Sequence, residues 1–251
     1  MSFVFKIFEH CYNSIREGKL IEKENSRDKE YHFQDWFKSR LEELKSNFDE
    51  PSRNSYPDFR MVGDALGFEL KGLQYPGRIT NYDSNSQVPT GLHNGRTVFY
   101  VFGRYPKEPL NPKKYPVHDL IICHGNFINS DHEYIHKNKS VKGFGSYGDI
   151  MIRDRKMYVA PTPYALTEGT ENQITLVVPV GLVAPAGFRA IGELVRVETG
   201  KLIVGYEFDL IANEIKAKKI DNPNSGLEHR FVAYRVSSDK GPRVSLKSEN
   251  E

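Results

Sequence analysis

The spacing of apolar residues changes near residue 57, and this change constrains the fold more than any other feature. Before it, apolar side chains recur every three or four residues, as on one face of a helix. After it, they alternate with polar residues or form short continuous runs, as in half-buried and buried strands. The chain is therefore expected to open with helices and to continue as a β-sheet.

Two helices are predicted in the first fifty residues. Residues Phe3 to Arg16 carry an apolar stripe, and Gly18 ends that helix. Residues Lys29 to Asn47 repeat the pattern with Phe33, Trp36, Phe37, Leu41 and Leu44.

Short strands are predicted from Pro57 onward. They cover residues 57–62, 67–73, 97–105, 118–125, 150–160, 174–180, 192–198, 201–208 and 229–237. Residues 150–160 are expected to form a hairpin with its turn at Asp154 to Lys156. Residues 192–198 are expected to join 201–208 through Thr199-Gly200. A short helix over Leu210 to Lys218 and a loose polar tail from Ser237 complete the expectation.

These elements predict a mixed α/β (α+β) fold, with a central mixed β-sheet flanked by the N-terminal helices. We expect a single domain over residues 1–251, since 251 residues can bury a sizeable core and no linker divides them. It would comprise a helical part (1–50), a core (51–160) and a β-rich C-terminal part (161–251). The net charge of +2 neither demands nor excludes nucleic acid, so a phosphate-binding face needs a local concentration of Lys and Arg.

The cytoplasm is the expected compartment. Cys11 and Cys123 are too few for a disulfide framework and fit two reduced thiols. The N-terminus is interrupted by charged residues and does not resemble a signal peptide. The apolar run over residues 174–188 carries no charge, contains two prolines and is too short to cross a bilayer, so no membrane partner is expected.

The segment Pro57 to Gly72 brings two carboxylates and a lysine together. In the strand 67–73, Glu69 and Lys71 share one face, opposite to Phe68 and Leu70. If this strand pairs with residues 57–62 as a hairpin, Asp58 lies on the same surface. Burying two like charges side by side costs several kcal/mol unless a cation compensates, and hard oxygen ligands favour Mg²⁺.

Mg²⁺ held by Asp58 and Glu69 suggests phosphodiester hydrolysis. A bound cation lowers the pKa of a water ligand and polarises a phosphoryl oxygen. Lys71 can orient that water or neutralise the charge that develops in the transition state.

Pro57-Asp58, followed after a gap by Glu69-Leu70-Lys71, resembles the signature of the PD-(D/E)xK nuclease superfamily, which includes most type II restriction endonucleases. The resemblance covers the helix before the motif, both motif strands and the buried strand pair after them. It implies a restriction-endonuclease-like core. It also implies a further metal-binding group on the preceding helix, where this chain has Gln34 instead of the commoner Glu, followed by Asp35.

Other motifs compete with this interpretation. Asp64 is an alternative first carboxylate, but it lies in a turn-prone segment where Asp is favoured for backbone reasons. A second D-x-K, at Asp154 and Lys156 after Asp149, reads better as a hairpin turn. The segment 143–148 matches G-x-G-x-x-G, but a strand rather than a helix follows it, so a dinucleotide site is not expected.

A zinc peptidase is the alternative from another enzyme class. His132, Glu133 and His136 match H-E-x-x-H, whereas the polar residues around them favour a loop over the helix that such a site needs. A non-catalytic DNA-binding protein is a further alternative, in which Glu69 and Lys71 belong to an ordinary strand surface.

DNA contacts are predicted from polar residues that suit phosphates and base edges. The candidates in the loop after the second motif strand are Arg78, Asn81, Asn85, Gln87, His93, Asn94 and Arg96. A second basic cluster comprises Arg153, Arg155 and Lys156, and a third comprises Lys216, Lys218 and Lys219. The function expected from the sequence is a Mg²⁺-dependent, sequence-specific endonuclease of double-stranded DNA, most like a type II restriction enzyme and acting as a homodimer. A repair or structure-specific nuclease is the nearest alternative.

Overall fold

A computed structural model describes residues 2–22, 29–50, 56–84, 87–130, 145–153 and 157–248. Four helices lie in these ranges: α1 (Phe3–Arg16), α2 (Lys29–Glu43), α3 (Gly125–Ile128) and α4 (Pro163–Leu166). The fold is a mixed α+β arrangement in which β-strands dominate around a central mixed sheet, as the apolar spacing predicts.

The central sheet has nine strands, and eight of them follow the order β14-β17-β13-β9-β7-β4-β3-β2. The pairs β4·β7 and β9·β13 are parallel, and the other pairs are antiparallel. The ninth strand, β6, pairs with the start of β7. The strands are β2 (Phe48–Asp49), β3 (Phe59–Met61), β4 (Leu66–Tyr75), β6 (Leu92–His93), β7 (Arg96–Pro106), β9 (Asp119–His124), β13 (Ile174–Pro179), β14 (Phe188–Val197) and β17 (Glu228–Val236).

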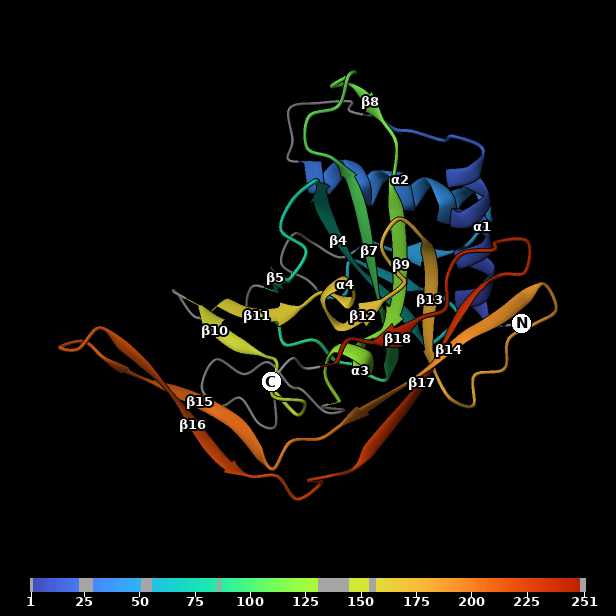
Figure 1. Ribbon diagram of the computed structural model, residues 1–251. Coiled ribbons are helices and arrows are strands. Elements are labelled where there is room, and N and C mark those ends of the chain that lie inside the picture. The colour runs from blue at the N-terminus through green and yellow to red at the C-terminus, as the bar shows by residue number, and fades with distance from the viewer. Residues whose placement is uncertain are drawn as a thin grey trace.

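Four smaller sheets surround the central one (Figure 1). They pair β1 (Ile21–Glu22) with β8 (Lys114–Tyr115), β12 (Thr167–Glu168) with β18 (Ser245–Leu246), β15 (Lys201–Asp209) with β16 (Glu214–Asp221), and β11 (Met157–Pro161) with both β10 (Met151–Arg153) and β5 (Asn81–Asp83). The β15–β16 hairpin extends away from the rest of the molecule as a long arm.

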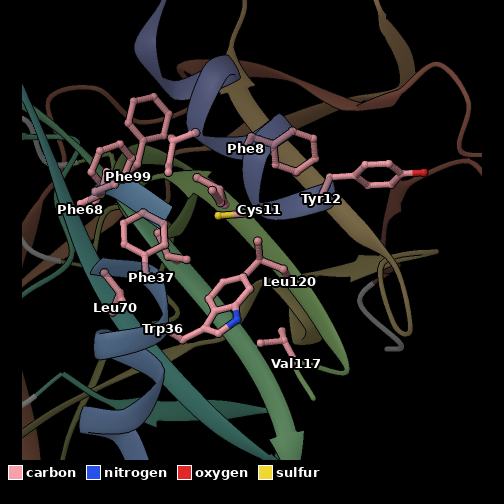
Figure 2. Close-up of a cluster of buried hydrophobic side chains, with 14 of the residues drawn as sticks. Phe8, Cys11, Tyr12, Trp36, Phe37, Phe68, Leu70, Phe99, Val117 and Leu120 are labelled. Carbon is pink, nitrogen blue, oxygen red and sulfur yellow. The ribbon is translucent and has the colours of Figure 1, made fainter. Parts of the chain in front are cut away.

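The central sheet buries a different apolar layer on each face. The helices α1 and α2 cover one face, and Figure 2 shows Trp36 and Phe37 of α2 near Phe68 and Leu70 of β4. The other face packs against α3, α4 and the β5–β11–β10 sheet. Because side chains alternate along β4, residues 69, 71 and 73 face this second layer.

A buried ion pair joins the two strands at the centre of the sheet. Arg104 of β7 and Asp119 of β9 are both almost inaccessible, and Arg104 Nε donates to Asp119 Oδ1 at 2.9 Å. The Tyr164 hydroxyl and the Asn172 backbone N–H also donate to the Asp119 carboxylate, at 2.9 and 2.7 Å. This satisfied carboxylate fixes α4 and the loop before β13 to the sheet.

Several expected elements are confirmed. The first helix has the predicted bounds, residues 57–62 and 67–73 form an antiparallel hairpin, and β10 pairs with β11. Cys11 and Cys123 are free thiols, and burial raises the pKa of both. None of the helices in the described part of the chain has the length and apolar character that crossing a bilayer requires.

Four local expectations are wrong. The second helix ends at Glu43, and the chain then forms β2. Residues 192–198 do not pair with 201–208, because β14 pairs with β17 and β15 pairs with β16. The expected helix over Leu210 to Lys218 is instead a turn followed by β16. The polar tail is ordered at Ser245–Leu246, where β18 pairs with β12.

Candidate metal centre and nucleic-acid interface

The β3–β4 hairpin places Asp58 opposite Glu69. Phe59 pairs with Phe68 and Arg60 with Gly67, and continuing this register by one residue aligns Asp58 with Glu69. Directly opposed residues of antiparallel strands have Cβ atoms about 5 Å apart. The backbone N–H of Leu70 donates to Asp58 Oδ2 at 2.7 Å, which orients the Asp58 carboxylate.

Glu69 and Lys71 form an ion pair on the same face of β4. Lys71 Nζ lies 2.8 Å from Glu69 Oε1, and the two side chains are only 12% and 11% exposed. Phe68 and Leu70 are fully buried on the opposite face. The hairpin therefore brings Asp58, Glu69 and Lys71 together, as their spacing predicts.

Three tyrosines lie beside these charges: Tyr82 and Tyr100 are buried, and Tyr56 is partly buried. The Tyr56 and Tyr100 hydroxyls lie 2.9 Å apart, and Lys71 Nζ lies 5.9 Å from the centre of the Tyr82 ring. Burial raises the pKa of all three hydroxyls, and the negative charge of Glu69 raises it further. These hydroxyls therefore stay protonated at neutral pH and provide hydrogen-bonding groups rather than charges.

Arg60 and His93 add polar groups near Tyr56. Arg60 lies on the same face of β3 as Asp58, because it is two residues away in an extended segment. The His93 ring packs edge-on against Tyr56 with 4.8 Å between ring centres. Burial lowers the pKa of the His93 imidazole, and the positive charge of Arg60 lowers it further.

Tyr56, Arg60 and Tyr82 are not among the site residues that the sequence predicts. The alternation in the segment PDFRM could have indicated Arg60. Tyr82 is brought under Lys71 by β5, which belongs to another sheet, so no local pattern reveals it.

Two other candidate acid or metal positions lie elsewhere. Gln34 is on α2, which packs against the Phe68–Leu70 face of β4, so the sheet separates this helix from the face that carries Glu69. Asp64 lies in the β3–β4 turn, where its backbone carbonyl accepts a hydrogen bond from Arg96.

The expected DNA contacts of the long loop divide into two groups. Arg78 and Asn81 line a cavity beside Lys71. Gln87, Asn94 and Arg96 have local structural roles: Gln87 donates to the Val88 carbonyl, Asn94 contacts His93 in the β6–β7 turn, and Arg96 donates to the Met61 carbonyl.

Several predicted residues lie outside the described ranges. These are Asn85, Asp154, Arg155, Lys156, and the peptidase candidates His132, Glu133 and His136. Of Arg153, only the backbone in β10 is described. Asp149, the first acid of the second D-x-K, forms an ion pair with Arg196. Gly145 and Gly148 have φ values of 76° and 79°, so these glycines serve a turn.

No group of three or more His, Cys, Asp or Glu side chains that could hold a metal ion occurs among the described residues. Mg²⁺ commonly takes one or two protein carboxylates and keeps several waters, so the opposed pair Asp58 and Glu69 fits its requirements.

Comparison of the chain with protein-family models, with curated proteins and with solved structures found no match.

Proposed function

We propose that this protein is a Mg²⁺-dependent, sequence-specific endonuclease of double-stranded DNA, most like a type II restriction enzyme. The observation that carries the proposal is the β3–β4 hairpin, which aligns Asp58 with Glu69 and holds Lys71 Nζ 2.8 Å from Glu69 Oε1. Placing a partly buried Asp58 opposite a buried Glu69 with one lysine is costly, and a site for a divalent cation accounts for that cost.

Asp58 and Glu69 would hold the Mg²⁺ ion. The Leu70 N–H fixes the orientation of Asp58, and the rigid strand β4 fixes the position of Glu69. When bound, the ion lowers the pKa of a water ligand and polarises a phosphoryl oxygen.

Lys71 has two roles in this proposal. Its ammonium group stabilises the negative charge that develops on the phosphoryl oxygens during hydrolysis, and it orients the attacking water. Tyr56, Tyr82 and Tyr100 limit the access of bulk water to the site, which strengthens the electrostatic effect of the ammonium group. Cutting both strands of a symmetric sequence requires two such sites, so we propose a homodimer on double-stranded DNA.

The test is a cleavage assay on unmethylated phage-length DNA, with Mg²⁺ and with EDTA. The wild-type protein and Lys71→Ala are compared with Lys6→Ala, which removes an exposed lysine on α1. Discrete fragments are expected from wild type and Lys6→Ala in Mg²⁺, and none from Lys71→Ala or in EDTA.

Other results would contradict the proposal. Equal cleavage by Lys71→Ala and wild type would place the catalytic centre elsewhere. Binding of DNA without cleavage in any divalent metal would favour the alternative of a DNA-binding protein, in which the Glu69–Lys71 ion pair only stabilises β4. Cleavage restricted to branched or damaged DNA would favour a repair nuclease.

A further inference from the structure

The edge of β4 beside the candidate metal centre is open. The strand β3 pairs only with Gly67 and Phe68, and within the described ranges no strand pairs with this edge beyond Phe68. The Leu70 N–H points to this side, because it donates to Asp58.

The backbone of β4 presents further donors along the open edge. Along a strand, N–H and C=O groups of alternate residues point to the same side. The Tyr75 carbonyl accepts from Lys107 N on the β7 side, so odd-numbered residues of β4 bond to β7. The N–H groups of Gly72 and Gln74 therefore point to the open edge, as the Leu70 N–H does.

Two adjoining cavities run along this edge, and together we call them the β4-edge groove. The first, of about 250 Å³, begins at Lys71 and is lined also by Asn81, Tyr82 and Asp83. The second, of about 450 Å³, continues past Gln74 and Gly77 to Tyr105 and Lys107. Both cavities include Gly72, Leu73 and Arg78, so they form one path that leads away from Lys71.

The lining of the β4-edge groove is positively charged and rich in hydrogen-bonding groups. Besides Lys71, which is paired with Glu69, Arg78 and Lys107 contribute two cations against one acid, Asp83. Asn81 and Tyr82 also line the groove and bring an amide and a phenol side chain to it. An occupant that carries negative charge and acceptor oxygens suits this lining, because the cations and N–H groups can bind it.

We propose that the β4-edge groove binds the sugar-phosphate backbone of the DNA strand next to the phosphate that is cleaved. This inference rests on the proposed nuclease function and adds the path of the strand. Arg78 and Lys107 bind phosphates, and the N–H groups of Gly72 and Gln74 donate to phosphate oxygens. From Lys71 to Gln74 the strand spans roughly 10 Å at 3.3 Å per residue, enough for a short run of phosphates.

A peptide strand is the other occupant that an open sheet edge can take. The charges of Arg78 and Lys107 favour the nucleic acid, because a peptide backbone carries no charge for them to neutralise.

The test compares two double variants that each remove two positive charges. Arg78→Ala/Lys107→Ala changes the groove, and Lys6→Ala/Lys240→Ala changes exposed lysines on α1 and in the loop after β17. Binding of a short fluorescent duplex of mixed sequence is measured by anisotropy in EDTA at several salt concentrations. Each phosphate contact contributes about 0.9 to the slope of log K against log salt, so the groove variant should lose about 2 from the slope. The control variant should keep the wild-type slope.

Cleavage of phage DNA in Mg²⁺ by the same proteins separates the two proposals. If the groove variant keeps the wild-type salt slope of DNA binding while the wild-type protein cleaves DNA, the groove is not the DNA site. The nuclease function then still stands. That result would point to a peptide strand as the occupant. If the groove variant has a reduced salt slope but the wild-type protein does not cleave DNA, the groove is a nucleic-acid site and the nuclease function is wrong. Thermal unfolding of both variants checks that the folded state is retained.

Discussion

The backbone N–H of Leu70 donates a hydrogen bond of 2.7 Å to Asp58 Oδ2, so one carboxylate both closes the β3–β4 hairpin and faces the candidate metal centre. Two substitutions of Asp58 distinguish the structural role from the metal-binding role. Asp58→Asn keeps an oxygen acceptor and removes the negative charge, whereas Asp58→Ala removes both.

We expect Asp58→Asn to reduce the cleavage rate by at least about 100-fold, because the charge that holds the metal is lost. Its unfolding free energy should stay near the wild-type value. Asp58→Ala should lose the same activity and about 1–2 kcal/mol of stability, since the Leu70 N–H is left without its acceptor. Cleavage rates and urea unfolding measure the two effects. Wild-type cleavage by Asp58→Asn would leave Asp58 with only its structural role.

Gly67 keeps the Pro57–Asp58 segment in position. A Cβ at Gly67 would overlap the Pro57 ring and lie 3.3 Å from the Phe59 carbonyl oxygen. Gly67→Ala should therefore displace Pro57 and with it Asp58, reduce cleavage, and destabilise the protein by about 1–3 kcal/mol.

Gly205→Ala in β15 is the matched control, because its Cβ would meet no atom within 4 Å. Its cleavage rate should equal that of the wild type. Equal rates for Gly67→Ala and wild type would show that the Pro57 ring can move without disturbing the site.

The Arg104–Asp119 ion pair should contribute far more to stability than an exposed ion pair. Asp119→Ala leaves the buried Arg104 with only the half-exposed Glu171 carboxylate, 3.4 Å away, as an ionic partner and should cost about 3–5 kcal/mol. Asp221→Ala removes the partner of Lys201, where both side chains are mostly exposed, and should cost less than about 1 kcal/mol. Urea unfolding of both variants provides the measurement. Similar losses would mean that the buried network relaxes or hydrates.

Glu43 should make stability depend on pH at the α1–α2 contact. Burial alone would raise the pKa of its carboxyl group, but hydrogen bonds from Lys19, Arg40 and His10 outweigh burial and lower the pKa from 4.5 to about 2. The unfolded chain therefore binds the proton more readily than the folded protein does. The stabilisation is complete above about pH 4.5 and is lost as pH falls toward 2.

Because the Glu43 side chain is 34% exposed, solvent screening limits this contribution to about 1–2 kcal/mol. Urea unfolding of wild type and Glu43→Gln at several pH values tests it. The difference between their unfolding free energies should shrink as pH falls below 4.5. A difference that does not change with pH would show that the charge of Glu43 has no role.

Local patterns predicted the elements that local forces determine. The apolar stripe and Gly18 located α1, and alternation located the hairpin that carries Asp58 and Glu69. Glu69 and Lys71 share a strand face, so their proximity follows from period two alone.

Long-range pairing determined what the sequence did not predict. Residues 210–218 include Ala, Glu and Lys, which favour helices, but Lys216 and its neighbours pair with β15 and become a strand. Thr199-Gly200 resembled a hairpin turn, whereas the partner of β14 is β17, about 30 residues further along the chain. Tyr82 reaches the site from a separate sheet, which no spacing in the sequence encodes.

The β15–β16 arm should unfold locally more readily than the central sheet. Every residue of β16 is exposed, and Leu210 and Ile211 at the tip are almost fully exposed. A two-stranded hairpin is at best marginally stable alone in water. The backbone amides of the outer arm should therefore exchange their hydrogens with solvent through local openings, while those of β7 and β9 exchange only when the whole sheet unfolds. The outer arm can therefore open while the core stays folded. The strands that carry Asp58 and Glu69, in contrast, belong to the central sheet.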